Sequence, residues 1–136
     1  MKYLLDTNTC IRYLNGRSPT VFQHLNETLE ADVCVCSVVK FELRYGALRS
    51  IYVEKTLTQQ EKFLTRYKSL PFDDAAHMHA AKIRADLARA GTPIGPYDLL
   101  IAAISLANNL IVVTHNTDEF GRVSGLKIED WEVSQT

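Results

Sequence analysis

Short apolar runs alternate with longer amphipathic stretches along the chain, and this alternation predicts strands separated by helices. The runs KYLL at 2–5 and LIVVT at 110–114 are almost continuously apolar, as expected for strands that are buried on both faces. The β-branched run Val33–Cys36 predicts another strand, and shorter strands are expected at 70–72 and 126–128. Strands that alternate with helices favour right-handed crossovers, and therefore a parallel sheet with helices on both faces.

Capping residues, proline and glycine mark the helix boundaries. Asp6 or Thr7 is placed to cap the first helix, and Ser18 followed by Pro19 predicts the start of the second. The predicted helices run from Thr7 to Gly16, from Pro19 onward, from the N-cap Ser37 to Gly46, over 56–67, over 74–90, and from Pro96 to Asn108. No repeat or long linker divides the sequence, so we expect residues 1–136 to form a single three-layer α/β/α domain around a central, mostly parallel sheet.

Length, composition and charge restrict the classes of function. The chain has 136 residues, of which 46% are hydrophobic and 23% are charged, which is typical of one globular domain with its own core. No segment approaches the ~20 apolar residues of a membrane span, and the start MKYLLDTN does not resemble a signal peptide, so a cytoplasmic protein is expected. A net charge of −1 gives no general attraction to nucleic acid. An enzyme acting on nucleic acid would then need a metal-screened site and local arginines, for which the candidates are Arg12, Arg17, Arg44 and Arg49.

Acidic side chains occur where predicted strands are followed by helices or loops. Asp6 follows the first strand, Glu42 lies in the helix after the second, and Asp98 lies in the first turn of the helix that begins at Pro96. A fourth group follows the strand at 110–114 and comprises Thr114, Asn116, Asp118 and Glu119. Because parallel strands end at one edge of their sheet, these residues are expected to converge there. Clustered carboxylates repel one another unless a cation lies among them, and oxygen ligands favour Mg²⁺ or Mn²⁺.

Each of these residues, taken singly, also has a purely structural explanation. Asp6 is a good helix N-cap, Glu42 suits an exposed helix position, and the helix dipole favours a carboxylate at Asp98. Asn8 provides either another oxygen ligand or a donor to Asp6. His115 either contacts a phosphate or a metal, or is a hydrogen-bonded structural residue. It is the complete set, at successive strand ends, that favours a shared site.

Four motifs together resemble the PIN domain, and within it the VapC toxins of bacterial type II toxin–antitoxin pairs. They are LLDTN, FELRYGA, IGPYDLLIAA and VVTHNTDEF, and they extend over essentially the whole chain in the order typical of the family. The resemblance implies a Mg²⁺- or Mn²⁺-dependent endoribonuclease that is made with a VapB-type antitoxin. It also implies that a specific structured RNA, preferably a tRNA anticodon stem-loop, is the substrate.

The same resemblance implies roles for individual residues. Asp6, Glu42 and Asp98 correspond to the core acidic residues, with Asp6 and Asp98 on the metal, and Glu119 is the fourth catalytic candidate. Many PIN domains have Asp at the position of Asn116, and others use an acidic residue just before the Phe, so which residue of this last motif completes the site stays open. The supporting positions are Asn8, Thr114, Asn116 and Asp118.

Three other functions fit the sequence less completely. A haloacid dehalogenase-type phosphatase needs a second Asp and a Thr or Val where this chain has Asn8 and Cys10, and Lys127 is poorly placed for a receiver domain. The presence of Asn116 favours a PIN-like module that binds RNA or protein with weak or no catalysis. The carboxylates Asp6, Glu42 and Asp98 argue against it. The chain is also expected to form a homodimer and to bind an antitoxin whose arginine bridges two site carboxylates. Apolar residues that serve either these contacts or the core are Ile11, Tyr13, Leu14, Tyr45 and Leu48.

Overall fold

The fold is known from a computed structural model, which describes residues 1–133; residues 134–136 of the predicted domain lie outside the described part. Five strands form one sheet in the order β3-β2-β1-β4-β5, and each neighbouring pair is parallel. The strands are β1 (Tyr3–Leu5), β2 (Val33–Cys36), β3 (Lys68–Leu70), β4 (Ile111–Val113) and β5 (Lys127–Glu129). The predicted α/β class with a parallel central sheet is confirmed.

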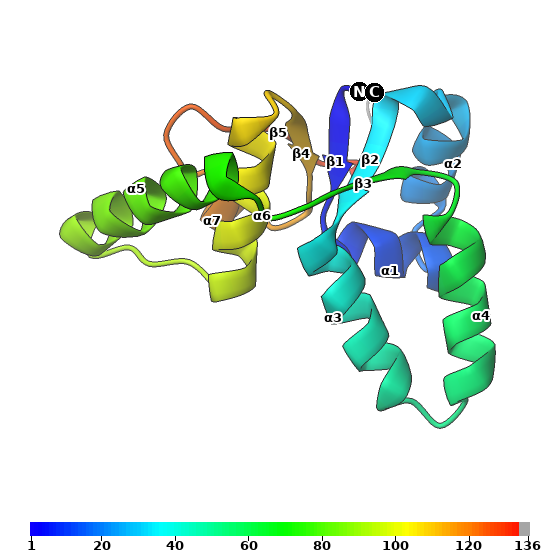
Figure 1. Ribbon diagram of the computed structural model, residues 1–136. Helices are drawn as coiled ribbons and strands as arrows, with labels where there is room; N and C mark the ends of the chain where they lie inside the picture. Colours follow the sequence, from blue (N-terminus) through cyan, green and yellow to red (C-terminus); the bar gives the residue numbers. More distant parts are fainter. Residues whose placement is uncertain (134–136) are drawn as a thin grey trace.

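Helices cover both faces of this sheet (Figure 1). The first group, on one side, comprises α1 (Thr7–Asn15), α2 (Pro19–Glu27), α3 (Ser37–Leu48) and α4 (Val53–Leu64). The second group comprises α5 (Asp74–Ala90), α6 (Pro96–Ala107) and the short α7 (Thr117–Phe120), and a 3₁₀ turn at Glu30–Asp32 precedes β2. In residues 1–133, no helix has the length and apolar character needed to cross a membrane.

The core is built on the central strands and on α6. Leu4 of β1, Val35 of β2 and Val112 of β4 are completely buried, which explains why these strands are apolar at consecutive positions rather than at alternate ones. Helix α6 is buried almost all round, since Ile101 and Ile104 are both fully inaccessible to solvent. Burying one such side chain stabilises a fold by about 1.5–3 kcal/mol, so the start of α6 is held firmly in place.

Two helix boundaries differ from the prediction. Helix α3 begins at Ser37, so Cys36 is the N-cap, and the helix continues through Gly46 to Leu48. Glycine does not end this helix because the buried Leu43 and Ala47 on either side of it anchor the same turn in the core. Helix α4 spans Val53–Leu64 instead of 56–67, since its apolar face docks on α3 one turn earlier than the sequence pattern indicates.

In two further segments the secondary structure differs from that predicted from the sequence. Strand β3 lies at Lys68–Leu70 rather than at 70–72, because Leu70 is opposite Cys36 in the sheet and the next residue is Pro71, which has no N–H to donate. The segment Thr117–Phe120, for which no helix was predicted, forms the single helical turn α7. This turn determines which acidic residue of the last motif faces the site.

Candidate active site

The predicted acidic residues gather at the edge of the sheet where β1 and β4 end side by side. Asp6 directly follows β1 and Thr114 directly follows β4, and the Asp6 N–H donates to the carbonyl of Val113 at 3.1 Å. Helices α3 and α6 bring Glu42 and Asp98 to the same edge, close enough for the charges of Asp6 and Glu42 to act on Asp98.

Asp6 caps a helix and also belongs to the acidic cluster. Its carboxylate accepts the Thr9 N–H at 2.8 Å, which fixes the start of α1, and it also accepts a hydrogen bond from the Thr114 side chain. The residue is only 3% exposed, and this burial raises the pKa of Asp6 although the hydrogen bonds act in the opposite direction. The two explanations offered by the sequence, cap and site residue, are therefore compatible.

Glu42 is tied to the same helix start by a residue that the sequence analysis did not assign to the site. The Thr7 hydroxyl donates to Oε1 of Glu42 at 2.6 Å, and this contact joins α1 to α3. The sequence marked Thr7 only as the alternative to Asp6 for capping the first helix. Asn8 itself is exposed in the first turn of α1.

Asn116 connects the remaining carboxylates. Its side-chain amide donates to Glu119 Oε2 at 2.7 Å and to Asp98 Oδ2 at 3.3 Å. The other oxygen of Glu119 accepts the N–H of Gly95 at 3.0 Å, and the Asn116 N–H donates to the Thr114 hydroxyl at 2.9 Å. The amide of Asn116 thus fixes the carboxylates of Asp98 and Glu119 relative to each other, beside the start of α6.

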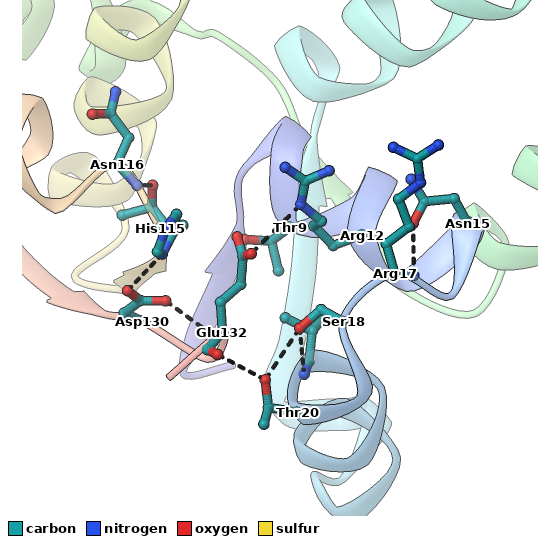
Figure 2. Close-up of polar contacts among 12 residues, drawn as sticks. Thr9, Arg12, Asn15, Arg17, Ser18, Thr20, His115, Asn116, Asp130 and Glu132 are labelled. Carbon is teal, nitrogen blue, oxygen red and sulfur yellow. Dashed lines mark hydrogen bonds and ion pairs between the residues drawn. The ribbon is translucent and has the colours of Figure 1, made fainter. Parts of the chain in front are cut away.

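Asp118 and His115 lie outside this network. Asp118 is exposed and pairs with Arg122 at 3.1 Å, so among the acidic residues of the last motif it is Glu119 that faces Asp98. Figure 2 shows Asn116 and His115 pointing in opposite directions, with His115 Nδ1 at 2.9 Å from Asp130 Oδ2. This ion pair, which raises the pKa of His115, favours a structural role for the histidine.

The cluster carries negative charge that the protein itself does not balance. Burial, and then the charges of Asp6 and Glu119, raise the pKa of Asp98 to about 6. Hydrogen bonds from Asn116 and from the Gly95 N–H lower the pKa of Glu119, so that carboxylate is readily ionised. Within residues 1–133, no Lys, Arg or His forms an ion pair with Asp6, Glu42, Asp98 or Glu119.

The chemistry of these donors fits a hard divalent cation. All candidate ligands are carboxylate, amide or hydroxyl oxygens, the type that Mg²⁺ and Mn²⁺ prefer. In the described part of the chain, no three His, Cys, Asp or Glu side chains are grouped so as to hold an ion by themselves. An ion that keeps several waters and uses one or two carboxylates suits such an open arrangement, and Asp6 is the carboxylate whose charge acts most strongly on Asp98.

Comparison with known proteins agrees with this geometry. The sequence matches the PIN domain family over residues 3–126. The tRNA(fMet)-specific endonuclease VapC of Shigella flexneri is 43% identical over 131 residues, which are 96% of this chain and 98% of the relative. The chain belongs to the VapC family of PIN domains.

Solved structures extend the likeness to three dimensions. DNA-bound VapBC from Salmonella typhimurium matches with a TM-score of 0.91 and 41% identity, over 96% of this chain and 98% of that one. VapBC2 from Rickettsia felis, bound to a fragment of its promoter DNA, matches with a TM-score of 0.88 and 30% identity, over 96% and 99%. The family resemblance carried by the four sequence motifs is confirmed.

The raised pKa of Asp98 predicts a pH-dependent gain in stability when its charge is removed. In the unfolded chain the group titrates near its ordinary value of 3.8, and in the fold near 6, so its ionisation opposes folding. This cost is absent below about pH 4, grows between about pH 4 and 6 and is complete above pH 6. Asp98→Asn should therefore be more stable than the unsubstituted protein at pH 7.5, by about 1 kcal/mol after allowance for solvent screening, and equal to it near pH 4.

Thermal unfolding of both proteins in EDTA across this pH range measures the effect. Asp86→Asn is the matched control, because ion pairs with Lys82 and Arg89 lower the pKa of Asp86, and its removal should not stabilise the protein at pH 7.5. A stability difference for Asp98→Asn that does not change with pH would contradict the prediction.

Proposed function

We propose that this VapC-family ribonuclease is a divalent-metal-dependent endoribonuclease toxin that cuts a structured RNA and thereby inhibits translation. The observation that carries the proposal is the meeting of Asp6, Glu42, Asp98 and Glu119 at one sheet edge, where no cationic side chain of residues 1–133 pairs with them. The proposed site of action is the cytoplasm, where translation takes place.

The site residues have distinct proposed roles. Asp6 and Asp98 would hold Mg²⁺ or Mn²⁺. When bound, the cation stabilises negative charge on the phosphate oxygens and lowers the pKa of water. Thr7 fixes one oxygen of Glu42, so the carboxylate is positioned to orient a water against the phosphate.

The other members of the site act mainly as supports. Asn116 and the Gly95 N–H hold Glu119 in its ionised form, and Thr114 supports both Asp6 and Asn116. Asn8 is exposed in the first turn of α1, two residues after Asp6. No protein nucleophile is required, and the expected products carry a 5′-phosphate and a 3′-hydroxyl.

The proposed substrate is a discrete RNA with unstacked loop bases. A protein with a net charge of −1 has little nonspecific hold on nucleic acid, and selective RNA recognition usually targets loops. Relatives from Shigella flexneri and Salmonella typhimurium are named tRNA(fMet)-specific endonucleases. The anticodon stem-loop of that tRNA is therefore the first substrate to test.

The proposed partner is a VapB-type antitoxin that binds beside the site. A groove of about 340 Å³ between α1, α3 and α4 is lined by apolar residues, including Ile11, Leu14 and Ala47, and Glu42 also contributes to its wall. An antitoxin helix in this groove would bring an arginine to the carboxylates and exclude the metal. The solved VapBC complexes support such a partner.

The contact residues expected from the sequence divide into three sets, of which Ile11 and Leu14 line the groove. Tyr13 stacks on Phe22 and packs at a tilt against Phe63, so it belongs largely to the packing between helices. Tyr45 and Leu48 are exposed along α3, outside the groove. We assign these two residues to the proposed homodimer contact.

The direct test is a cleavage assay with a panel of purified tRNAs, with and without Mg²⁺ or Mn²⁺. Selective cutting of one or a few tRNAs, abolished by EDTA and restored by either ion, is expected. The alternative, a PIN-like module that binds without catalysis, predicts RNA binding with no metal-dependent products. Equal cleavage of all single-stranded RNA, or a preference for duplex DNA, would contradict the proposed substrate.

A further inference from the structure

Two aromatic rings contact each other on the surface at the edge of the acidic site. Phe41 and Tyr97 are 52% and 44% exposed, and their ring centroids are 5.3 Å apart with an interplanar angle of 71°. Phe41 belongs to α3 and Tyr97 to α6, so the contact joins helices from the two layers of the fold (Figure 1). Neither ring is part of the buried core.

The position of the pair relative to the carboxylates points to a role in the reaction. Phe41 directly precedes Glu42, and Tyr97 directly precedes Asp98. The contact between the rings lies between α3 and α6, the two helices that carry Glu42 and Asp98 to the acidic site. Neither ring lines the groove between α1, α3 and α4.

The charges near the pair suit a polyanion. Lys40 and Arg44 are exposed on α3, one residue before and three residues after Phe41, and they line a surface pocket that α3 forms with α4. Within residues 1–133 neither side chain forms an ion pair. Aromatic rings beside unpaired cations are the combination by which proteins bind single-stranded nucleic acid, since bases stack on the rings while cations meet the phosphates.

We propose that Phe41 and Tyr97 form a stacking platform for one or two unpaired bases next to the scissile phosphate. This inference rests on the proposed nuclease function and adds a substrate-binding element to the same site. The edge-to-face contact keeps both rings in defined orientations before RNA arrives, which reduces the entropy lost on binding. Because every base has an aromatic face, the platform contributes affinity and register rather than sequence selectivity.

The test measures binding separately from cleavage. The probe is a synthetic tRNA(fMet) anticodon stem-loop with 2-aminopurine in the loop, added in EDTA to Asp6→Asn protein. In that background, Phe41→Leu/Tyr97→Leu should raise the Kd of the hairpin about tenfold, since stacking on an aromatic ring contributes about 1–3 kcal/mol per base. The quenching of 2-aminopurine on binding should also weaken, whereas Tyr97→Phe should keep both the affinity and the quenching.

Tyr52→Leu is the matched control, because Tyr52 is 70% exposed at the start of α4 and precedes no site carboxylate. It should leave the Kd unchanged within about twofold, and circular dichroism should show that all variants are folded.

The platform would be overturned if the double variant bound the hairpin with an unchanged Kd. If the protein with Asp6 intact also cleaved tRNA normally, the nuclease function would still stand. The platform would also be overturned if the double variant changed only the oligomeric state or antitoxin binding, since the rings would then contact protein. Failure of the parent protein to bind or cut any RNA would overturn both proposals.

Discussion

Asp6→Asn and Asp98→Asn proteins are expected to lose RNA cleavage by about 10³-fold or more while they remain folded. Stabilisation of developing phosphate charge by a metal is worth several kcal/mol, and each 1.36 kcal/mol changes the rate about tenfold. Removing one of the two carboxylates proposed to hold the ion removes this contribution. Neither substitution opens a cavity, because asparagine has nearly the shape of aspartate.

Single-turnover cleavage of the same tRNA at saturating Mg²⁺ measures the loss, and calorimetry of Mn²⁺ binding shows whether it arises from the metal. Asp86→Asn removes a carboxylate from the exposed face of α5 and should retain full activity. Asparagine at position 6 still accepts the Thr9 N–H, so the α1 cap should survive. Full activity in either site variant would remove that residue from the metal site.

Gly46→Leu is expected to make the enzyme resistant to its antitoxin without abolishing cleavage. Gly46 lies within α3 and lines the proposed antitoxin groove, and a Cβ built there meets no atom within 4 Å. A leucine therefore fits the helix and occupies the groove. Blocking the central contact of an interface typically costs about 2–4 kcal/mol, so the concentration of antitoxin needed for inhibition should rise by about 30-fold or more.

Gly46→Ala is the control for this change. Alanine leaves most of the groove open and should keep inhibition normal, and it should raise the free energy of unfolding by about 0.5–1 kcal/mol because alanine is the better helix former. Titration of tRNA cleavage with purified antitoxin compares the two proteins. Equal inhibition of both would show that the antitoxin binds elsewhere.

Most of the fold follows from local sequence signals. The buried strands at 3–5, 33–36 and 111–113 are apolar without interruption. Gly16 and Gly91 mark the ends of α1 and α5, and Pro19 marks the start of α2. The errors occurred where a tertiary contact decides the outcome. Packing of α3 against its neighbours carries the helix past Gly46, and the pairing of Leu70 with Cys36 sets the position of β3.

The same distinction applies to the site. Asp6 is recognisable because it directly follows a strand, Glu42 because it lies in the helix after the next strand, and Asp98 because it lies in the first turn of a helix that begins at a proline. The choice between Asp118 and Glu119 required α7, whose single turn directs Glu119 to the Gly95 N–H and Asp118 to Arg122. Contacts between distant segments, such as the Thr7–Glu42 hydrogen bond, leave no local pattern in the sequence.

The chemical nature of the RNA ends tests the central claim most directly. Purified protein is incubated with tRNA(fMet) and Mg²⁺, and the fragments are sequenced and treated with enzymes that distinguish terminal groups. A metal-assisted attack by water predicts one main cut in the anticodon loop, with a 5′-phosphate and a 3′-hydroxyl, and no product in EDTA or with Asp98→Asn. Fragments that end in a 2′,3′-cyclic phosphate, or cleavage that continues in EDTA, would contradict a carboxylate-held metal as the basis of catalysis.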